Sequence, residues 1–206
     1  MDRTEIKNLI LFAAIECVEE CGMDGVTMRK IARKAGMNSA LLHYYYGSKE
    51  NLMEAVSRAT LTEGLSTNIL DYEGRWETDT EGALRGFLYD TLTGMLTYPN
   101  ITKSHFYEVM VNNNYECAAI KEFKQFFEIL YTFAGSVMTG KSEQEKRTAF
   151  VQMFSIVLTT GLMPGIFPGS FALDLSDDNT RRNFSDSIVD RFTESSLTSK
   201  KSNKKS

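Results

Sequence analysis

The chain has 206 residues, a formal net charge of −4, and 42% hydrophobic and 24% charged residues, which is typical of a globular protein with a sizeable core. This composition excludes disordered, collagen-like and disulfide-stapled chains, and no apolar run reaches the roughly 18–20 residues of a membrane span. The charged first residues lack the apolar stretch of a secretory signal, and three cysteines are too few for a disulfide framework. We therefore expect a cytoplasmic protein.

Apolar periodicity and capping residues predict an all-α chain of about nine helices. Only three prolines interrupt it, and proline is the residue that most strongly breaks helices. The first helix is expected over residues 4–21. Thr27 should cap a short second helix that Gly36 ends, and Asn38 should cap a short third helix that Gly47 ends.

Longer helices are expected beyond these two. A cap at Ser48 and capping boxes at 78–81 and 142–145 indicate helix starts, and Pro99 indicates a helix end. Further helices are expected over residues 102–111, 115–139 and 178–196. The pattern predicts three parts: an N-terminal module at residues 4–64, a larger helical domain at 65–198, and a disordered basic tail at 199–206.

Charge is distributed unevenly along this acidic chain. Residues 26–49 contain five lysines and arginines and no acidic residue. Within this window, residues 28–47 have the organisation of a helix-turn-helix, because Ala32 permits close helix approach and Gly36 permits a left-handed turn. The third helix would then present an outer face to the major groove of DNA. The alternative is an ordinary helical hairpin with a solvated basic face.

The module resembles the DNA-binding module of the tetracycline-repressor (TetR) family of bacterial regulators. The matching stretches are GMDGVTMRKIA at 22–32, AGMN at 35–38 and LHYYYGSKENL at 42–52. The resemblance implies a sequence-specific transcriptional regulator whose contacts to double-stranded DNA are made by Thr27, Arg29, Asn38, Ser39, His43, Tyr44 and Lys49. His43 stands where the family usually has tyrosine, which puts that contact in doubt and adds a titratable imidazole. Tyr46 replaces the usual phenylalanine, a conservative change.

A single module buries little surface, so we expect a two-fold homodimer on a pseudo-palindromic operator. The last two long helices carry apolar stripes that are candidates for a four-helix dimer interface. The candidate interface residues are Phe150, Phe154, Val157, Phe184, Ile188 and Phe192. The alternative is that these side chains belong to the core of one chain.

Aromatic and sulfur-bearing residues of the middle helices suit a small apolar or aromatic effector. The candidate pocket consists of Tyr89, His105, Phe106, Met110, Phe127, Tyr131 and Met153. An effector that prefers one tilt of the fourth helix would release a repressor from its operator. The alternative is that most of these residues are core.

An enzyme is the main competing class of function. We expect no catalytic site, metal or cofactor, because the two histidines and three cysteines lack metal-site spacing and the chain has no phosphate-binding or dinucleotide-binding loop. An all-helical enzyme with scattered carboxylates remains an alternative, as does a non-specific DNA-binding or adaptor protein.

Overall fold

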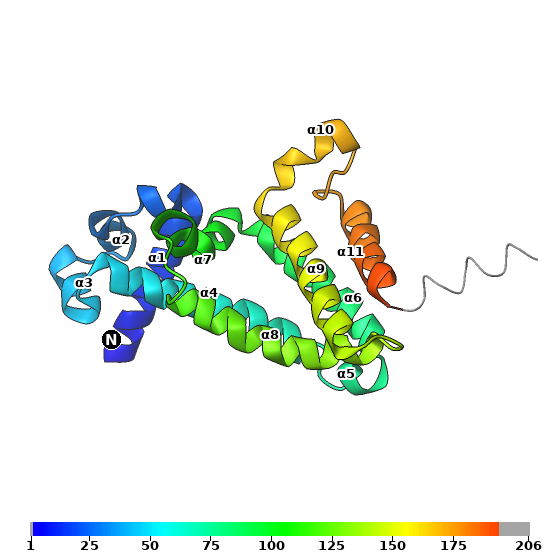
Figure 1. The fold of residues 1–206 in the computed structure, drawn as a ribbon. Coiled ribbons are helices and arrows are strands. Elements are labelled where there is room, and N and C mark those ends of the chain that lie inside the picture. The colour runs from blue at the N-terminus through cyan, green and yellow to red at the C-terminus, as the bar shows by residue number, and fades with distance from the viewer. Residues whose placement is uncertain (1, 194–206) are drawn as a thin grey trace, which may run out of the picture. The chain divides into compact units, whose positions relative to one another are not determined.

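The computed structural model describes residues 2–193, without the side chains of residues 65–68 and 70. Every regular element in this part is a helix, which confirms the all-α prediction. The elements are α1 (Arg3–Gly25), α2 (Met28–Lys34), α3 (Ser39–Tyr46), α4 (Lys49–Leu70), α5 (Arg75–Thr78), α6 (Thr80–Thr97), α7 (Pro99–Asn112), α8 (Ala118–Val137), α9 (Glu143–Leu162), the 3₁₀ helix η1 (Pro164–Ile166), α10 (Pro168–Phe171) and α11 (Asp178–Phe192) (Figure 1).

Nine of these α-helices have seven or more residues, and the sequence predicted about nine. The additional α5 and α10 have four residues each, which is too short to show a helical period. The predicted disordered tail at 199–206 and the predicted end of the last helix at residue 196 lie outside the described residues.

Local capping sets several helix boundaries. Thr27, Asn38 and Ser142 accept hydrogen bonds from the first turns of α2, α3 and α9, as predicted. The first helix begins slightly earlier than the predicted residue 4, because Asp2 is its N-cap and forms a capping box with Glu5.

Two predicted boundaries of later helices also differ in detail. Asp79 accepts a hydrogen bond from Gly82 N at 3.0 Å and so caps α6 in place of the predicted box at 78–81. Pro99 is the first residue of α7, a position where its missing N–H costs nothing, rather than only the end of the preceding helix.

The chain forms two compact units, which we call unit 1 and unit 2. Unit 1 comprises the described residues up to Gly64 together with Tyr98–Lys124, and unit 2 comprises Leu65–Thr97 together with the described residues from Gln125 onward. The chain first passes from unit 1 to unit 2 between Gly64 and Leu65. Residues 98–124 differ from the prediction, because they pack with the N-terminal module and not with the second domain.

Unit 1 includes α7 because polar side chains of α1 hold it. The Glu19 carboxylate accepts hydrogen bonds from the backbone N–H of Ile101 at 2.9 Å and of Asn100 at 3.5 Å, and so caps the start of α7. The Tyr107 hydroxyl donates to Asp24 at 2.7 Å. Figure 1 shows α7 lying beside α1. The core below these bonds is aliphatic, with Ile10, Val18 and other small side chains fully buried.

Unit 2 has an aromatic core. Trp76 stacks on Phe133 with ring centroids 4.7 Å apart, and Phe87 and Phe126 lie at 5.7 Å. Leu130 completes this core with no exposed surface. Helices α6, α9 and α11 pack against one another around these side chains.

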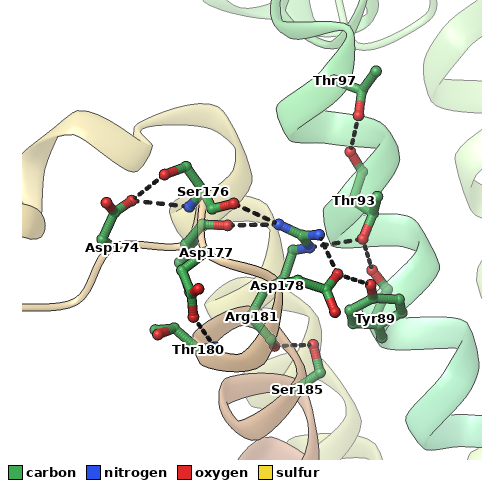
Figure 2. Close-up of polar contacts among 11 residues, drawn as sticks. Tyr89, Thr93, Thr97, Asp174, Ser176, Asp177, Asp178, Thr180, Arg181 and Ser185 are labelled. Carbon is green, nitrogen blue, oxygen red and sulfur yellow. Dashed lines mark hydrogen bonds and ion pairs between the residues drawn. The ribbon is translucent and has the colours of Figure 1, made fainter.

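A polar network attaches α11 to α6 in unit 2 (Figure 2). Arg181 donates to Thr93 Oγ1 at 2.9 Å, to the Leu175 carbonyl at 2.9 Å and to Asp178 at 2.8 Å. The Tyr89 hydroxyl also donates to Asp178. The guanidinium donors of Arg181 therefore fix the loop before α11 as well as the helix itself.

Candidate DNA-binding site

The turn between α2 and α3 has the geometry that the sequence predicts. Gly36 adopts φ +67°, and Met37 N donates to Ala32 O at 2.9 Å across the turn. Ala32 is buried between the helices, as are Ile31 and Leu42. Because a left-handed residue without a Cβ reverses the chain here, α3 follows α2 after a very short connection.

Helix α3 buries one side and exposes the other. Leu42 is fully buried in the core of unit 1, whereas Ala40, His43 and Tyr44 are exposed. Tyr44 is 73% exposed, and its ring meets the ring of Tyr45 edge-on at 5.1 Å. His43 and Tyr44 follow Ala40 by three and four positions and therefore form one stripe with it along the helix.

The two N-cap residues retain groups that can contact DNA. The Thr27 oxygen accepts from Lys30 N at 3.2 Å, and the Asn38 carbonyl oxygen accepts from Leu41 N at 2.9 Å. Both residues are exposed, and both caps use acceptor atoms. The Thr27 O–H and the Asn38 amide N–H groups are donors and suit phosphate oxygens or base acceptors. Ser39, the first residue of α3, is half-buried.

The basic window has two kinds of residue. Lys30 donates to the Gly25 carbonyl at 2.7 Å, Lys49 donates to the Met23 carbonyl at 3.1 Å, and Lys34 pairs with Glu20 at 2.5 Å. These lysines tie α2 and α4 to the end of α1. Arg29 and Arg33 on α2 are exposed and supply positive charge at the surface. Arg33 was not among the predicted contacts, although it lies in the same acid-free window.

Tyr46 and His43 fix the end of α3. The Tyr46 hydroxyl donates to the Lys7 carbonyl of α1 at 3.0 Å, and burial raises the pKa of this hydroxyl above its usual value. His43 Nδ1 lies 2.8 Å from the Gly47 carbonyl oxygen. The replacement of phenylalanine by Tyr46 therefore adds a bond between helices inside the module.

A family model matches the segment of the chain that forms this site. The family model described as bacterial regulatory proteins, tetR family, matches residues 10–56, which include α2, α3 and the turn between them. This segment of the chain is similar to the tetR family of bacterial regulatory proteins. Residues 10–56 contain all seven of the predicted DNA contacts.

Two curated relatives are similar to part of this chain. It is 29% identical over 80 residues to the tetracycline repressor protein class A from transposon 1721 of Escherichia coli, covering 39% of this chain and 37% of the relative. It is 42% identical over 55 residues to the HTH-type transcriptional regulator BetI of Rhizobium meliloti strain 1021, covering 27% of each. The matches thus span about a third of these relatives' lengths.

Solved structures resemble the fold over nearly the whole chain. A TetR transcription regulator from Haloarcula marismortui aligns with a TM-score of 0.69 at 19% identity, covering 93% of this chain and 100% of that one. HlyIIR, a hemolysin II transcriptional regulator, aligns with a TM-score of 0.59 at 23% identity, covering 94% and 99%. At these identities the likeness establishes the fold alone.

The predicted effector-pocket residues divide between the two units. His105, Phe106 and Met110 lie in unit 1, where Phe106 stacks on Phe123 at 5.1 Å and Met110 is 75% exposed. His105 is largely buried and lies 2.8 Å from Thr60 Oγ1, and burial lowers its pKa to about 4. A neutral imidazole therefore links α7 to α4 within unit 1.

The other predicted pocket residues lie in unit 2 and have partners there. The Tyr131 hydroxyl donates to Glu143 at 2.6 Å, and the ring of Tyr89 lies against Arg182 at 4.0 Å. Phe127 packs on the aromatic core and Met153 is fully buried in it. A surface hollow elsewhere, along α4, contains none of the predicted residues and is lined by Asn51, Glu54, Ala55, Arg58, Ala59, Thr62 and Glu63.

The predicted dimer stripes face inward in unit 2. Five of the six side chains are buried within one chain and the sixth, Phe184, is half-buried against the same core; the five are Phe150, Phe154, Val157, Ile188 and Phe192. The rings of Phe150 and Phe154 lie 4.9 Å apart, and both contact Phe127. In the described structure these side chains of α9 and α11 therefore pack within one chain, which agrees with the alternative that they belong to its core.

Residues 2–193 contain no group of three or more His, Cys, Asp or Glu side chains placed to hold a metal ion. None of the helices described there is long and apolar enough to cross a membrane. Cys17, Cys21 and Cys117 are free thiols, and burial raises the pKa of Cys17.

Proposed function

We propose that this chain is a sequence-specific DNA-binding transcriptional regulator that acts as a two-fold homodimer on a pseudo-palindromic operator. The observation that carries the proposal is the exposed stripe of α3, in which His43 and Tyr44 lie opposite the buried Leu42. An exposed short helix after a tight turn is the element that enters the major groove in helix-turn-helix proteins. The tetR-family match over this same segment supports the proposal.

The contacts divide into two classes. His43, Tyr44 and Ser39 of α3 would face base edges, together with the amide of Asn38. The remaining residues would hold phosphates on either side; these are Thr27 and Arg29 at the start of α2, and Lys49 at the start of α4. Lys49 already donates one N–H to a carbonyl, so its other N–H groups are the ones that would contact phosphate.

We assign DNA binding to residues 4–64, and effector binding and dimerisation to residues 65–198. Helices α9 and α11 remain the proposed dimer contact, through outer residues rather than through the buried stripes. Val151 on α9 is 62% exposed and lies on this outer side. Replacing Val151 by Glu should give monomers in sedimentation experiments and weaken operator binding, whereas retained dimers would exclude this surface.

A small apolar or aromatic effector is proposed to release the protein from its operator as a repressor. Aromatic and sulfur-bearing side chains of unit 2, such as Phe127 and Met153, support this ligand chemistry. Among the described residues of unit 2, Thr91 Oγ1 is a buried hydroxyl without a hydrogen-bond partner, which a polar group on a ligand would satisfy. We propose that the protein acts in the bacterial cytoplasm, on the nucleoid, without a cofactor.

The test of DNA recognition is competition at fixed salt, because phosphate contacts alone bind any sequence. Duplexes selected by the full chain from a random library are competed against unselected duplex. We expect at least about a thousandfold preference for selected sequence. Equal binding to both would indicate a non-specific DNA-binding protein instead.

Two substitutions should separate the two classes of contact. Arg29→Ala should weaken selected and unselected duplexes alike and reduce the salt slope by about one, because it removes a phosphate contact. Tyr44→Ala should weaken selected duplex more than unselected duplex. Arg147→Ala is the matched control, since this exposed arginine of unit 2 pairs with Glu143 and should leave binding unchanged.

A further inference from the structure

The imidazole of His43 is held in one tautomer by the end of its own helix. His43 Nδ1 lies 2.8 Å from the Gly47 carbonyl oxygen, and Gly47 N donates to the His43 carbonyl at 2.9 Å. Gly47 adopts φ +78°, which turns its carbonyl away from the helical direction. Because a carbonyl oxygen only accepts, Nδ1 must carry the proton of the neutral ring.

The tautomer determines what the other ring nitrogen can do. In a neutral imidazole with a proton on Nδ1, Nε2 has a lone pair and no hydrogen, so it can only accept. Among the described residues, Nε2 forms no hydrogen bond of its own. His43 is exposed in the middle of the α3 stripe, between Ala40 and Gly47, so this acceptor belongs to the surface proposed to face DNA.

A lone acceptor discriminates sharply among the groups of a DNA duplex. Phosphate oxygens, guanine N7 and O6, and thymine O4 are all acceptors, and none of them can pair with it. The donors in the major groove are the exocyclic amino groups, N6 of adenine and N4 of cytosine. Neutral His43 therefore cannot serve as a phosphate contact, which is the role an N–H or O–H side chain would take.

We propose that His43 is a specificity-determining residue that reads an exocyclic amino group, of adenine or cytosine, through Nε2. This inference rests on the proposed DNA-binding function and adds the class of base contacted. It also predicts that the two side chains differ in selectivity. The Tyr44 hydroxyl both donates and accepts, so it can hydrogen-bond to more kinds of base edge than His43 can.

The first test measures the tautomer directly in the full chain. The chain has two histidines, His43 and His105, so the His43→Gln variant assigns both sets of imidazole signals in a ¹⁵N-labelled sample. At pH 7.5 we expect the His43 signals of an imidazole protonated at Nδ1 and unprotonated at Nε2. A proton on Nε2, or an even mixture of tautomers, would overturn the proposal whether or not the protein binds DNA.

The second test removes single amino groups from duplex selected by the full chain. Each adenine in a half-site is replaced by purine, which lacks N6, and each cytosine by 2-pyrimidinone, which lacks N4. At one position we expect wild-type affinity to fall about tenfold, and His43→Ala to show no further loss from the same replacement. Tyr44→Phe is the matched control and should remain as sensitive at that position as wild type.

The outcomes distinguish this inference from the function on which it rests. If removing an amino group weakens binding by His43→Ala at every position where it weakens binding by the wild type, the proposal is overturned while specific binding stands. A uniform loss of affinity with a salt slope reduced by about one would make His43 a phosphate contact and also overturn it. If the wild type selects no sequence, the proposed function fails and this proposal with it.

Discussion

Each of the two compact units is stabilised internally by a different kind of interaction. In unit 1, helix boundaries and helix pairs depend on polar groups that contact backbone, such as the caps of α2 and α3 and the Glu19 carboxylate at the start of α7. In unit 2, a cluster of rings around Trp76, Phe87 and Phe126 fills the core. The difference shows that the boundaries of α2 and α3 are set by short-range signals, whereas the core of unit 2 forms from side chains that meet from distant parts of the chain.

The largest effect is expected in the aromatic core. Phe87→Ala should lower the free energy of unfolding by about 3–5 kcal/mol, because it removes a fully buried ring that contacts Trp76 and Phe126 and leaves a cavity. Urea unfolding measures this loss. Phe171→Ala is the control, since Phe171 is 71% exposed and should change stability by no more than about 0.5 kcal/mol. Similar losses for both variants would contradict the assignment of the core.

Hydrogen exchange on the Phe87→Ala variant would sharpen the comparison between the units. We expect amides of α6 and α9 to lose protection more than amides of α2 and α3, because the removed ring belongs to unit 2. Equal loss in all four helices would show that both units unfold as a single cooperative structure.

Unit 1 should be the more sensitive to acid, through His105. Burial lowers the pKa of His105 to about 4, below the ordinary histidine value of 6.5, so the unfolded chain binds a proton first. Its contribution to stability is therefore complete above about pH 6.5 and is lost as the pH falls toward 4, by up to about 3 kcal/mol. Urea unfolding from pH 7.5 to 4.5 measures the loss.

The His105→Gln variant isolates this contribution from that of the carboxylates. Glutamine retains hydrogen-bonding groups near Thr60 but does not titrate, so stability should depend less on pH than in wild type between pH 6.5 and 4.5. His43→Gln is the matched control, since His43 is exposed, and should keep the wild-type pH dependence. Identical curves for all three proteins would show that protonation of His105 is not the cause.

A smaller effect is expected from the carboxylate that attaches α7 to α1. Glu19→Ala should cost about 0.5–2 kcal/mol, as the loss of a helix N-cap does, and should expose the first amides of α7 to hydrogen exchange. Glu16→Ala is the control, because its exposed pair with Lys34 at 3.4 Å should contribute at most about 1 kcal/mol. A loss of α7 protection in both variants would mean that Glu19 has no special role.

Local features of the fold could be predicted from the sequence, whereas contacts between distant residues could not. The caps Thr27 and Asn38 and the turn at Gly36 are local signals, and each was predicted at the residue where it occurs. The placement of α7 in unit 1 was not predicted, because the bond from Glu19 to Ile101 joins residues more than eighty positions apart. No periodicity within one helix reports such a contact.

The aromatic stripes of α9 and α11 show the opposite limit. Their spacing correctly indicated that Phe150, Phe154 and Ile188 share buried helix faces, but periodicity is the same whether a face meets its own chain or a partner. Tyr89 was assigned to a pocket for its ring, whereas its hydroxyl donates to Asp178 on α11 (Figure 2). Its ring lies against Arg182 of the same helix. These partners were identifiable only once the helices were placed together.

The smallest predicted effect tests whether the helix-turn-helix depends on backbone conformation alone. Gly36 has φ +67°, and a Cβ added there would meet no atom within 4 Å, so Gly36→Ala should cost only the strain of a left-handed alanine, about 1 kcal/mol. Gly36→Asn should cost a few tenths of a kcal/mol, because asparagine adopts this conformation more readily. Urea unfolding of the full chain compares the two variants. If alanine and asparagine cost the same, steric contact rather than backbone conformation would set the requirement for glycine, and the local basis of the module would be wrong at its central residue.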